Sequence, residues 1–190
     1  MQNTCAIAFK EWAAVCAALG EGRQAIILRK GGIHEGRAGF RVAHSEFWLF
    51  PTYLHEAAEG LLDDARPFLE RALAGRPSAE TIRLTEYAVV TDVIEVTNES
   101  LLANLAGQHV WSPQTVLNRF HYRQPGLFAL VVRIYRSREP LVIPDSPHFA
   151  GCRSWVELPE SLSTGGLEPA LDAEAFGRMR SASLDALGSS

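Results

Sequence analysis

The residues best suited to chemistry lie in one glycine-rich stretch, residues 29–46. This stretch holds four cations (Arg29, Lys30, Arg37 and Arg41), two histidines, two glutamates and four glycines between two apolar runs. Glycine lets the backbone turn sharply and approach a ligand closely. Arginine and lysine supply the hydrogen-bond donors that an anion needs. The stretch is therefore the first candidate site, and the chemistry it favours is the binding of a phosphate-bearing anion.

A metal site is a second interpretation of the same region. Histidine and carboxylate side chains are common ligands of zinc and iron. If residues 40–48 form a strand, His44 and Glu46 point to the same face, as a chelating pair must. The spacing matches no recognised metal motif, and ordinary hydrogen bonds of loop and edge residues are the alternative. The potential ligands are His34, Glu35, His44, Glu46, His55 and Glu56.

A second basic region lies at residues 119–138, which carry five arginines and no carboxylate although the whole chain has a net charge of −4. At its start, residues 119–123 interleave cations with aromatic rings. Proteins that bind single-stranded nucleic acid use this mixture, because arginines neutralise the backbone while rings stack on bases. The alternative is a helix end with Phe120 in the core and the charges in solvent.

Together the two regions predict a cleft that binds a nucleic acid, for instance a single strand, or a nucleotide-like anion. Such binding requires no cofactor. We expect Lys30 to be an exposed cation that contributes little to stability. The residues predicted to line the cleft are Arg29, Lys30, Arg41, His44, Trp48, Arg119, His121, Tyr122, Arg133 and Arg153.

Two other functions compete with binding. In a nuclease or phosphoesterase, Lys30 would stabilise the charge on the reacting phosphorus, and Glu35 or Glu46 would hold a metal or act as the base. His44 would then be the acid or base. In a protein-interaction module, the apolar face of a helical insertion at about residues 53–76 would bind the partner.

Composition predicts a single cytoplasmic domain. The 190 residues are 47% hydrophobic and 21% charged, as in an ordinary globular protein, and can bury a full core. No apolar run approaches the ~20 residues of a membrane span, and the first residues lack the basic region of a signal peptide. The three cysteines have no paired spacing, which argues against a disulfide framework.

The pattern of elements predicts an α+β fold with a mixed sheet that tends towards a small barrel. We expect one domain over residues 1–160 and a C-terminal tail or helix over 161–190. The helices expected lie at 9–19, 54–62, from Pro67 to about 74, after Asn98 or Ser100, from Ser112, and at 171–187. The strands expected lie at 25–29, 40–50, 87–97, 127–135, 139–143 and 154–158.

Three segments, 30–35, 47–52 and 151–156, resemble those of a bacterial family known only as a domain of unknown function. The resemblance covers roughly residues 8–160 and implies no activity.

A second resemblance is to PUA-like domains of the ASCH and EVE type. It rests on residues 9–29 and on residues 128–140, which end in Glu139-Pro140 and are followed by Gly151 and Trp155. This resemblance implies a small β-barrel that binds RNA or modified bases, and a few ASCH members resemble nucleases. The chain departs from that pattern in a helical insertion at 53–80 and in lacking a Gly-x-Lys-x-x-Glu signature near the first strand.

Overall fold

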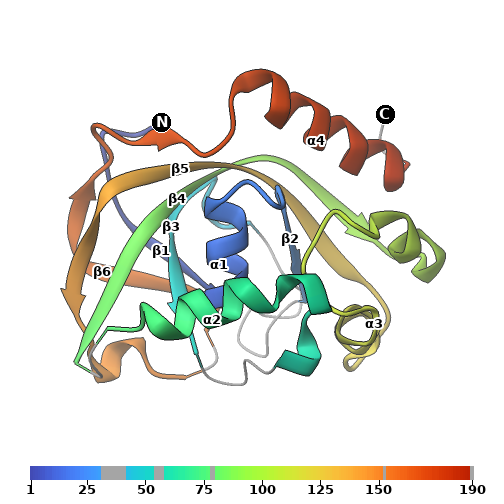
Figure 1. Ribbon diagram of the computed structural model, residues 1–190, viewed down its shortest axis with the longest axis horizontal. Coiled ribbons are helices and arrows are strands. Elements are labelled where there is room, and N and C mark those ends of the chain that lie inside the picture. Colours follow the sequence, from blue (N-terminus) through green and yellow to red (C-terminus); the bar gives the residue numbers. More distant parts are fainter. Residues whose placement is uncertain (31–41, 54–57, 78–79, 152, 189–190) are drawn as a thin grey trace.

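The computed structural model describes residues 1–30, 42–53, 58–77, 80–151 and 153–188 of the chain. These residues form one mixed β-sheet with helices packed on it (Figure 1). The predicted α+β class and mixed sheet are therefore confirmed.

The sheet has the strand order β2-β5-β4-β3-β1-β6, and a short seventh strand pairs with β5. β1 and β3 are parallel, whereas the other pairs are antiparallel. The strands are β1 (Thr4–Trp12), β2 (Ile26–Arg29), β3 (Glu46–Thr52), β4 (Thr81–Val96), β5 (Leu127–Pro144), β6 (Trp155–Ser163) and β7 (Glu168–Pro169).

The expected barrel is not closed, which corrects the sequence-based prediction. Closure requires hydrogen bonds between the two edge strands, and within the described residues β2 and β6 are not paired. A side-chain contact joins the two edges instead: Arg29, at the end of β2, donates a hydrogen bond of 2.9 Å to Ser154, just before β6. The backbone carbonyl of Ser154 also accepts from Lys10 of β1 at 2.8 Å.

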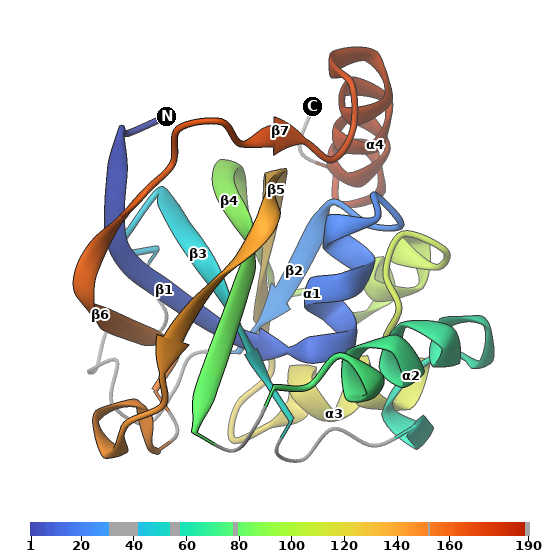
Figure 2. The same cartoon turned by 60° about the vertical axis from the view of Figure 1, so that its left-hand side comes forward.

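Three of the helices, α1 (Ala13–Gly20), α2 (Arg66–Ala74) and α3 (Pro113–His121), gather on one side of the sheet, while α4 (Ala173–Ala186) runs across one end (Figures 1 and 2). Side chains cap the starts of two helices: Ser112 accepts from the Thr115 N–H at 3.3 Å, and Asp172 accepts from the Ala175 N–H at 2.7 Å. No helix in the described part of the chain has the length and apolar character needed to cross a membrane.

At β3 the sheet is buried on both faces. In β3, Phe47 and Leu49 belong to the core beneath the helices, whereas Trp48 and Phe50 belong to a second core on the opposite face, which also contains Tyr87. This alternation explains the continuous apolar run of residues 47–50, because a strand covered on both sides needs no polar positions.

Several predicted elements are confirmed. α2 begins beside Pro67, α3 follows its Ser112 cap, Asn98 caps the 3₁₀ helix Glu99–Leu105, and the C-terminal helix is present. The helix predicted from Phe9 is wrong, because β1 continues through Trp12 and α1 begins only at Ala13. The end of β1 and the whole of α1 both bury apolar residues. The apolar residues of the strand therefore matched the spacing of the helix that follows, and the helix was predicted to begin too early. The strands predicted at 127–135 and 139–143 are one strand, β5.

One half-buried carboxylate lies in the scaffold away from the candidate residues. Glu86 of β4 lies against Gly20, the last residue of α1, where a Cβ would come within 2.7 Å of its Oε1. Burial raises the pKa of Glu86 to about 7; Arg136 on the neighbouring strand acts in the opposite direction, and Glu21 adds to the rise. A group whose pKa is raised on folding stabilises the protein below its unfolded pKa, and this contribution is lost as the pH rises through the folded value.

We therefore predict that Glu86→Gln stabilises the protein at pH 8 and has little effect at pH 4.5. The difference between the two gains should be about 1–3 kcal/mol in the free energy of unfolding, measured by denaturant titration at both pH values. Glu95→Gln, an exposed position on the same strand, serves as the control and should show no such pH dependence. A gain that is equal at both pH values would contradict the prediction.

Candidate anion-binding site

Three charged side chains meet where β1, β2 and α3 end, and we call Glu11, Arg29 and Arg119 the arginine cluster. Glu11 lies near the end of β1, Arg29 is the last residue of β2, and Arg119 lies in the last turn of α3. Arg29 Nη1 lies 3.8 Å from Glu11 Oε2, and Arg119 Nη1 donates to the Leu28 carbonyl at 3.1 Å. The fold thus brings together one arginine from each of the two basic regions.

Aromatic rings surround both guanidinium groups. The guanidinium carbon of Arg29 lies 4.7 Å from the centroid of Phe9, and that of Arg119 lies 4.7 Å from Trp111 and 5.1 Å from Trp12. Such cation–π contacts stabilise a partly desolvated cation and fix the plane of its guanidinium. The cations are therefore held in place by the core.

Hydrogen bonding within the cluster is incomplete. Glu11 is only 2% exposed, and its Oε1 accepts from the Trp12 N–H at 2.8 Å. Its Oε2, and the Nε of Arg29, are buried without a hydrogen-bond partner among the residues that the structure describes. Buried polar atoms are nearly always satisfied, so the Arg29 donor and the Glu11 acceptor each have an unused hydrogen-bonding position.

The charge balance of the cluster favours an anion. Two guanidinium groups face one carboxylate, which leaves one positive charge in excess. Burial lowers the pKa of Arg119, the Glu11 carboxylate acts in the opposite direction, and the Arg29 guanidinium lowers it further. An anion bound beside Arg29 and Arg119 would relieve the repulsion between them.

Lys30 has a different environment from the one expected. Its ammonium group donates hydrogen bonds to three backbone carbonyls, those of Phe120 at 3.1 Å, Gln124 and Gly126. Burial lowers the pKa of this lysine. Lys30 thus satisfies carbonyls at the end of α3 and in the turn that follows. The expectation of an exposed cation with no structural role is corrected.

Other candidates lie at the surface around these elements. The His44 ring is half-buried and lies 5.1 Å from the Trp155 ring, and Arg153, exposed, precedes Ser154. His121 Nε2 lies 2.8 Å from a carboxylate oxygen of Glu99. Tyr122 is 53% exposed.

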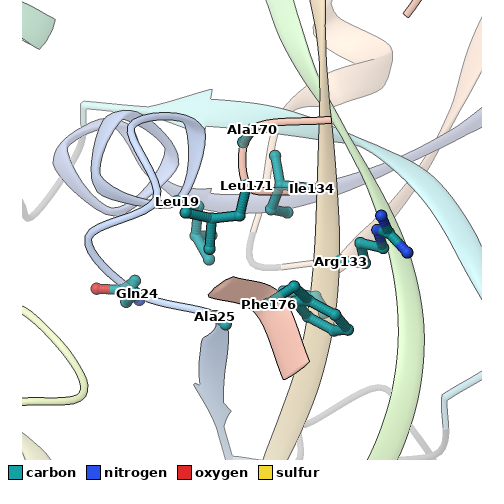
Figure 3. Close-up of a pocket in the computed structure, with 9 residues that line it drawn as sticks. Leu19, Gln24, Ala25, Arg133, Ile134, Ala170, Leu171 and Phe176 are labelled. Atoms are coloured by element: carbon teal, nitrogen blue, oxygen red, sulfur yellow. The ribbon is translucent and has the colours of Figure 1, made fainter. Parts of the chain in front are cut away.

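Arg133 is not brought to the arginine cluster. On β5 it lies five residues from Phe128, the residue that pairs with Arg29, a distance of about 17 Å along a strand. It lies instead at a small cavity beneath α4, with its guanidinium carbon 5.6 Å from the Phe176 ring and pointing away from Leu19 (Figure 3). The cavity volume of about 10 Å³ has room for one water molecule.

Two further expectations are wrong. Trp48 is fully buried in the second core and cannot contact a ligand at the surface. His44 and Glu46 do not share a strand face, because β3 begins at Glu46. Glu46 is engaged by the Gln2 N–H and the Tyr87 hydroxyl, both at 2.8 Å. Burial would raise its pKa, but these hydrogen bonds and the N-terminal ammonium group lower it.

Part of the predicted site lies outside the described residues. This holds for Glu35 and Arg41 of the predicted catalytic and binding sets, and for His34, His55 and Glu56 of the metal alternative. Within the described ranges, no three His, Cys, Asp or Glu side chains lie close enough together to hold a metal ion.

Sequence reasoning missed three residues of the cluster and its walls: Glu11, Trp12 and Ser154. With residues 4–12 assigned as a strand, period-2 alternation would have placed Glu11 on the same face as Phe9. A charged residue such as Glu11 on an otherwise apolar strand face is a signal of function. The signal was not seen because these residues were predicted to form a helix.

The contacts of Lys30 predict that Lys30→Met destabilises the protein by about 1–3 kcal/mol, because two half-buried carbonyls and one exposed carbonyl lose their charged donor. Chemical denaturation measures the change, and Arg153→Met, at an exposed position, is the control that removes a cation without such contacts. If the two variants were equally stable, Lys30 would have no structural role.

Comparison with solved structures finds crystal structures of ASCH from Zymomonas mobilis. One has 12% sequence identity and a TM-score of 0.46, and the match covers 92% of this chain and 93% of that chain. A mutant of the same protein gives 12% identity and a TM-score of 0.47, with 95% and 98% covered. The expected resemblance to ASCH domains is confirmed as a structural similarity with the identities and TM-scores given above.

A search of curated proteins finds no match to the chain. The sequence model of one family, the domain of unknown function DUF1802, matches residues 8–182. This range contains residues 8–160, over which the sequence resemblance was expected, and extends into α4. The chain therefore belongs to the DUF1802 family.

Proposed function

We propose that this protein binds a nucleic acid or a nucleotide-like anion at the arginine cluster. The observation that carries the proposal is the buried pair of unpartnered atoms, Arg29 Nε and Glu11 Oε2, beside an excess positive charge. Phosphate oxygens accept hydrogen bonds from a guanidinium group. A sugar hydroxyl or a base amino group donates one to a carboxylate. A nucleotide carries both kinds of group within a few ångströms.

The surroundings of the cluster favour a nucleotide over a small inorganic anion. Arg119 lies one helical turn before Tyr122, whose exposed ring and neighbouring Arg123 offer a stacking surface and a further cation. Arg153, next to the Ser154 that bonds to Arg29, adds a cation at the surface. Cations and rings in this arrangement suit a ligand that has both a phosphate backbone and bases.

The competing functions receive less support from the described residues. A nuclease would need Lys30, His44 and either Glu35 or Glu46 at one phosphate, and Glu35 lies outside the described residues. Lys30 is bonded to backbone carbonyls, and Glu46 is held by the N-terminus and Tyr87. For a protein-interaction module, the apolar face of the helical insertion should be exposed, yet Phe68 and Leu69 of α2 are buried in the main core.

Binding can be measured by fluorescence anisotropy with a short labelled single-stranded oligonucleotide at several salt concentrations. We predict that the affinity falls as salt rises, because phosphate neutralisation releases counterions. Arg29→Met should lower the affinity by about tenfold or more, since a lost charge-assisted contact contributes ~1.5–3 kcal/mol. Arg153→Ala should reduce the slope of log K against log salt by about 0.7, as expected for one lost phosphate contact.

The matched control is Arg138→Met, which removes an exposed arginine that pairs with Glu168 on another part of the sheet. It should leave both the affinity and the salt slope unchanged. Unfolding curves of each variant separate lost binding from lost folding, and Arg153→Ala, at an exposed position, keeps the test valid if Arg29→Met is unstable. The proposal fails if the wild type does not bind at low salt, or if Arg138→Met and the two site variants behave alike.

A further inference from the structure

The turn after α3, residues 122–126, is held by hydrogen bonds from Lys30. The Lys30 ammonium group contacts the carbonyls of Phe120, Gln124 and Gly126, which precede, lie in and end the turn. Within the turn, the Gly126 N–H donates to the Phe120 carbonyl at 3.1 Å and the Gln124 N–H to the Tyr122 carbonyl at 2.9 Å. One half-buried cation thus contacts three carbonyls of an otherwise exposed loop.

The conformation of the turn is a strained one. Arg123 has φ = +66° and is the one residue other than glycine with positive φ among those that the structure describes. A non-glycine residue in this region costs of order 1–3 kcal/mol and persists only where the surroundings enforce it. The hydrogen bonds from Lys30 to both sides of Arg123 supply that enforcement.

The turn presents an aromatic ring to solvent. Tyr122 is 53% exposed, whereas Trp48, Tyr87 and Trp111 are fully buried. The guanidinium carbon of Arg123 lies 5.2 Å from the centroid of the Tyr122 ring, so the strained residue itself backs the ring. An aromatic plane backed by a guanidinium group is a surface on which a flat, unpaired base can stack.

Tyr122 is also continuous with the arginine cluster. Its N–H donates to the Arg119 carbonyl at 3.3 Å, and Lys30 directly follows Arg29. Arg119 and Tyr122 are three residues apart, which is about one helical turn or ~5 Å along the axis, so a base next to a phosphate bound at Arg119 is within reach of the Tyr122 ring. A base inside a duplex has both faces covered by its neighbours and could not stack there.

We propose that Tyr122 is a stacking subsite for an unpaired base of a single-stranded nucleic acid, and that Lys30 is the positioning residue that holds the turn in place. This proposal rests on the proposed function of the arginine cluster. It assigns the ligand to the single-stranded class, and it gives Lys30 a role in recognition without contact with the ligand.

The test compares two labelled oligonucleotides of equal length and charge, one with bases and one whose sites are abasic. For the wild type we predict that the oligonucleotide with bases binds about 10- to 100-fold more tightly, the range expected from stacking of one base. Tyr122→Leu should reduce this ratio to near 1 without changing the affinity for the abasic strand. Tyr122→Phe, which keeps the ring, should retain the ratio.

Lys30→Met should lower the affinity for the oligonucleotide with bases by a larger factor than the affinity for the abasic one, and Lys30→Arg, which keeps a cationic donor, should restore part of the ratio. A drop of equal size for both oligonucleotides would show that Lys30 acts only on the fold as a whole and would overturn its positioning role. Unlabelled duplex of the same sequence should displace the labelled strand less well than unlabelled single strand. A duplex that competes equally well would overturn the assignment to single strands.

The two proposals fail in different ways. If the wild type binds neither oligonucleotide at low salt, the proposed function is wrong and the stacking subsite is wrong with it. If it binds both with equal affinity, the arginine cluster binds an anion as proposed, but Tyr122 does not stack on a base.

Discussion

The contact between Arg29 and Ser154 is the interaction on which the site depends. The sheet curls until its edge strands β2 and β6 approach each other, but they do not pair within the described residues. Arg29 crosses this gap with a 2.9 Å hydrogen bond and packs on Phe9 of β1. Because a side chain and not a ladder of backbone hydrogen bonds links the two edges, a charged group lies at the junction of three elements. The fold and the proposed anion site therefore share one residue.

The sequence predicted the local features of this architecture well. Pro67, Pro113 and the Ser112 cap located the starts of α2 and α3, because proline and capping residues act within one helical turn. The two basic regions also pointed to Arg29 and Arg119, which the fold brings into one cluster. The type of side chain alone was enough to select these two arginines, because any site proposed to bind phosphate needs cations.

The long-range features could not be predicted from the same signals. Glu11 and Trp111 join the cluster only through tertiary packing, and Lys30 reaches carbonyls about 90 residues away in sequence. Trp48 looked like a stacking ring because nothing local shows that a second core covers that face of β3. Whether the sheet closes depends on whether its two edge strands, β2 and β6, pair with each other. The sequence of neither strand alone contains that information.

The geometry of the guanidinium group explains how Arg29 can serve both the fold and a ligand. A guanidinium group has five N–H donors arranged in a rigid plane. In Arg29, Nη2 bonds to Ser154 and Nη1 faces Glu11, while the Nε edge has no acceptor within the described part of the chain. A ligand on the Nε edge would leave the contact that bridges the sheet intact. Binding would then add the missing acceptor to a group that the fold already holds in position, so little conformational entropy would be lost on binding.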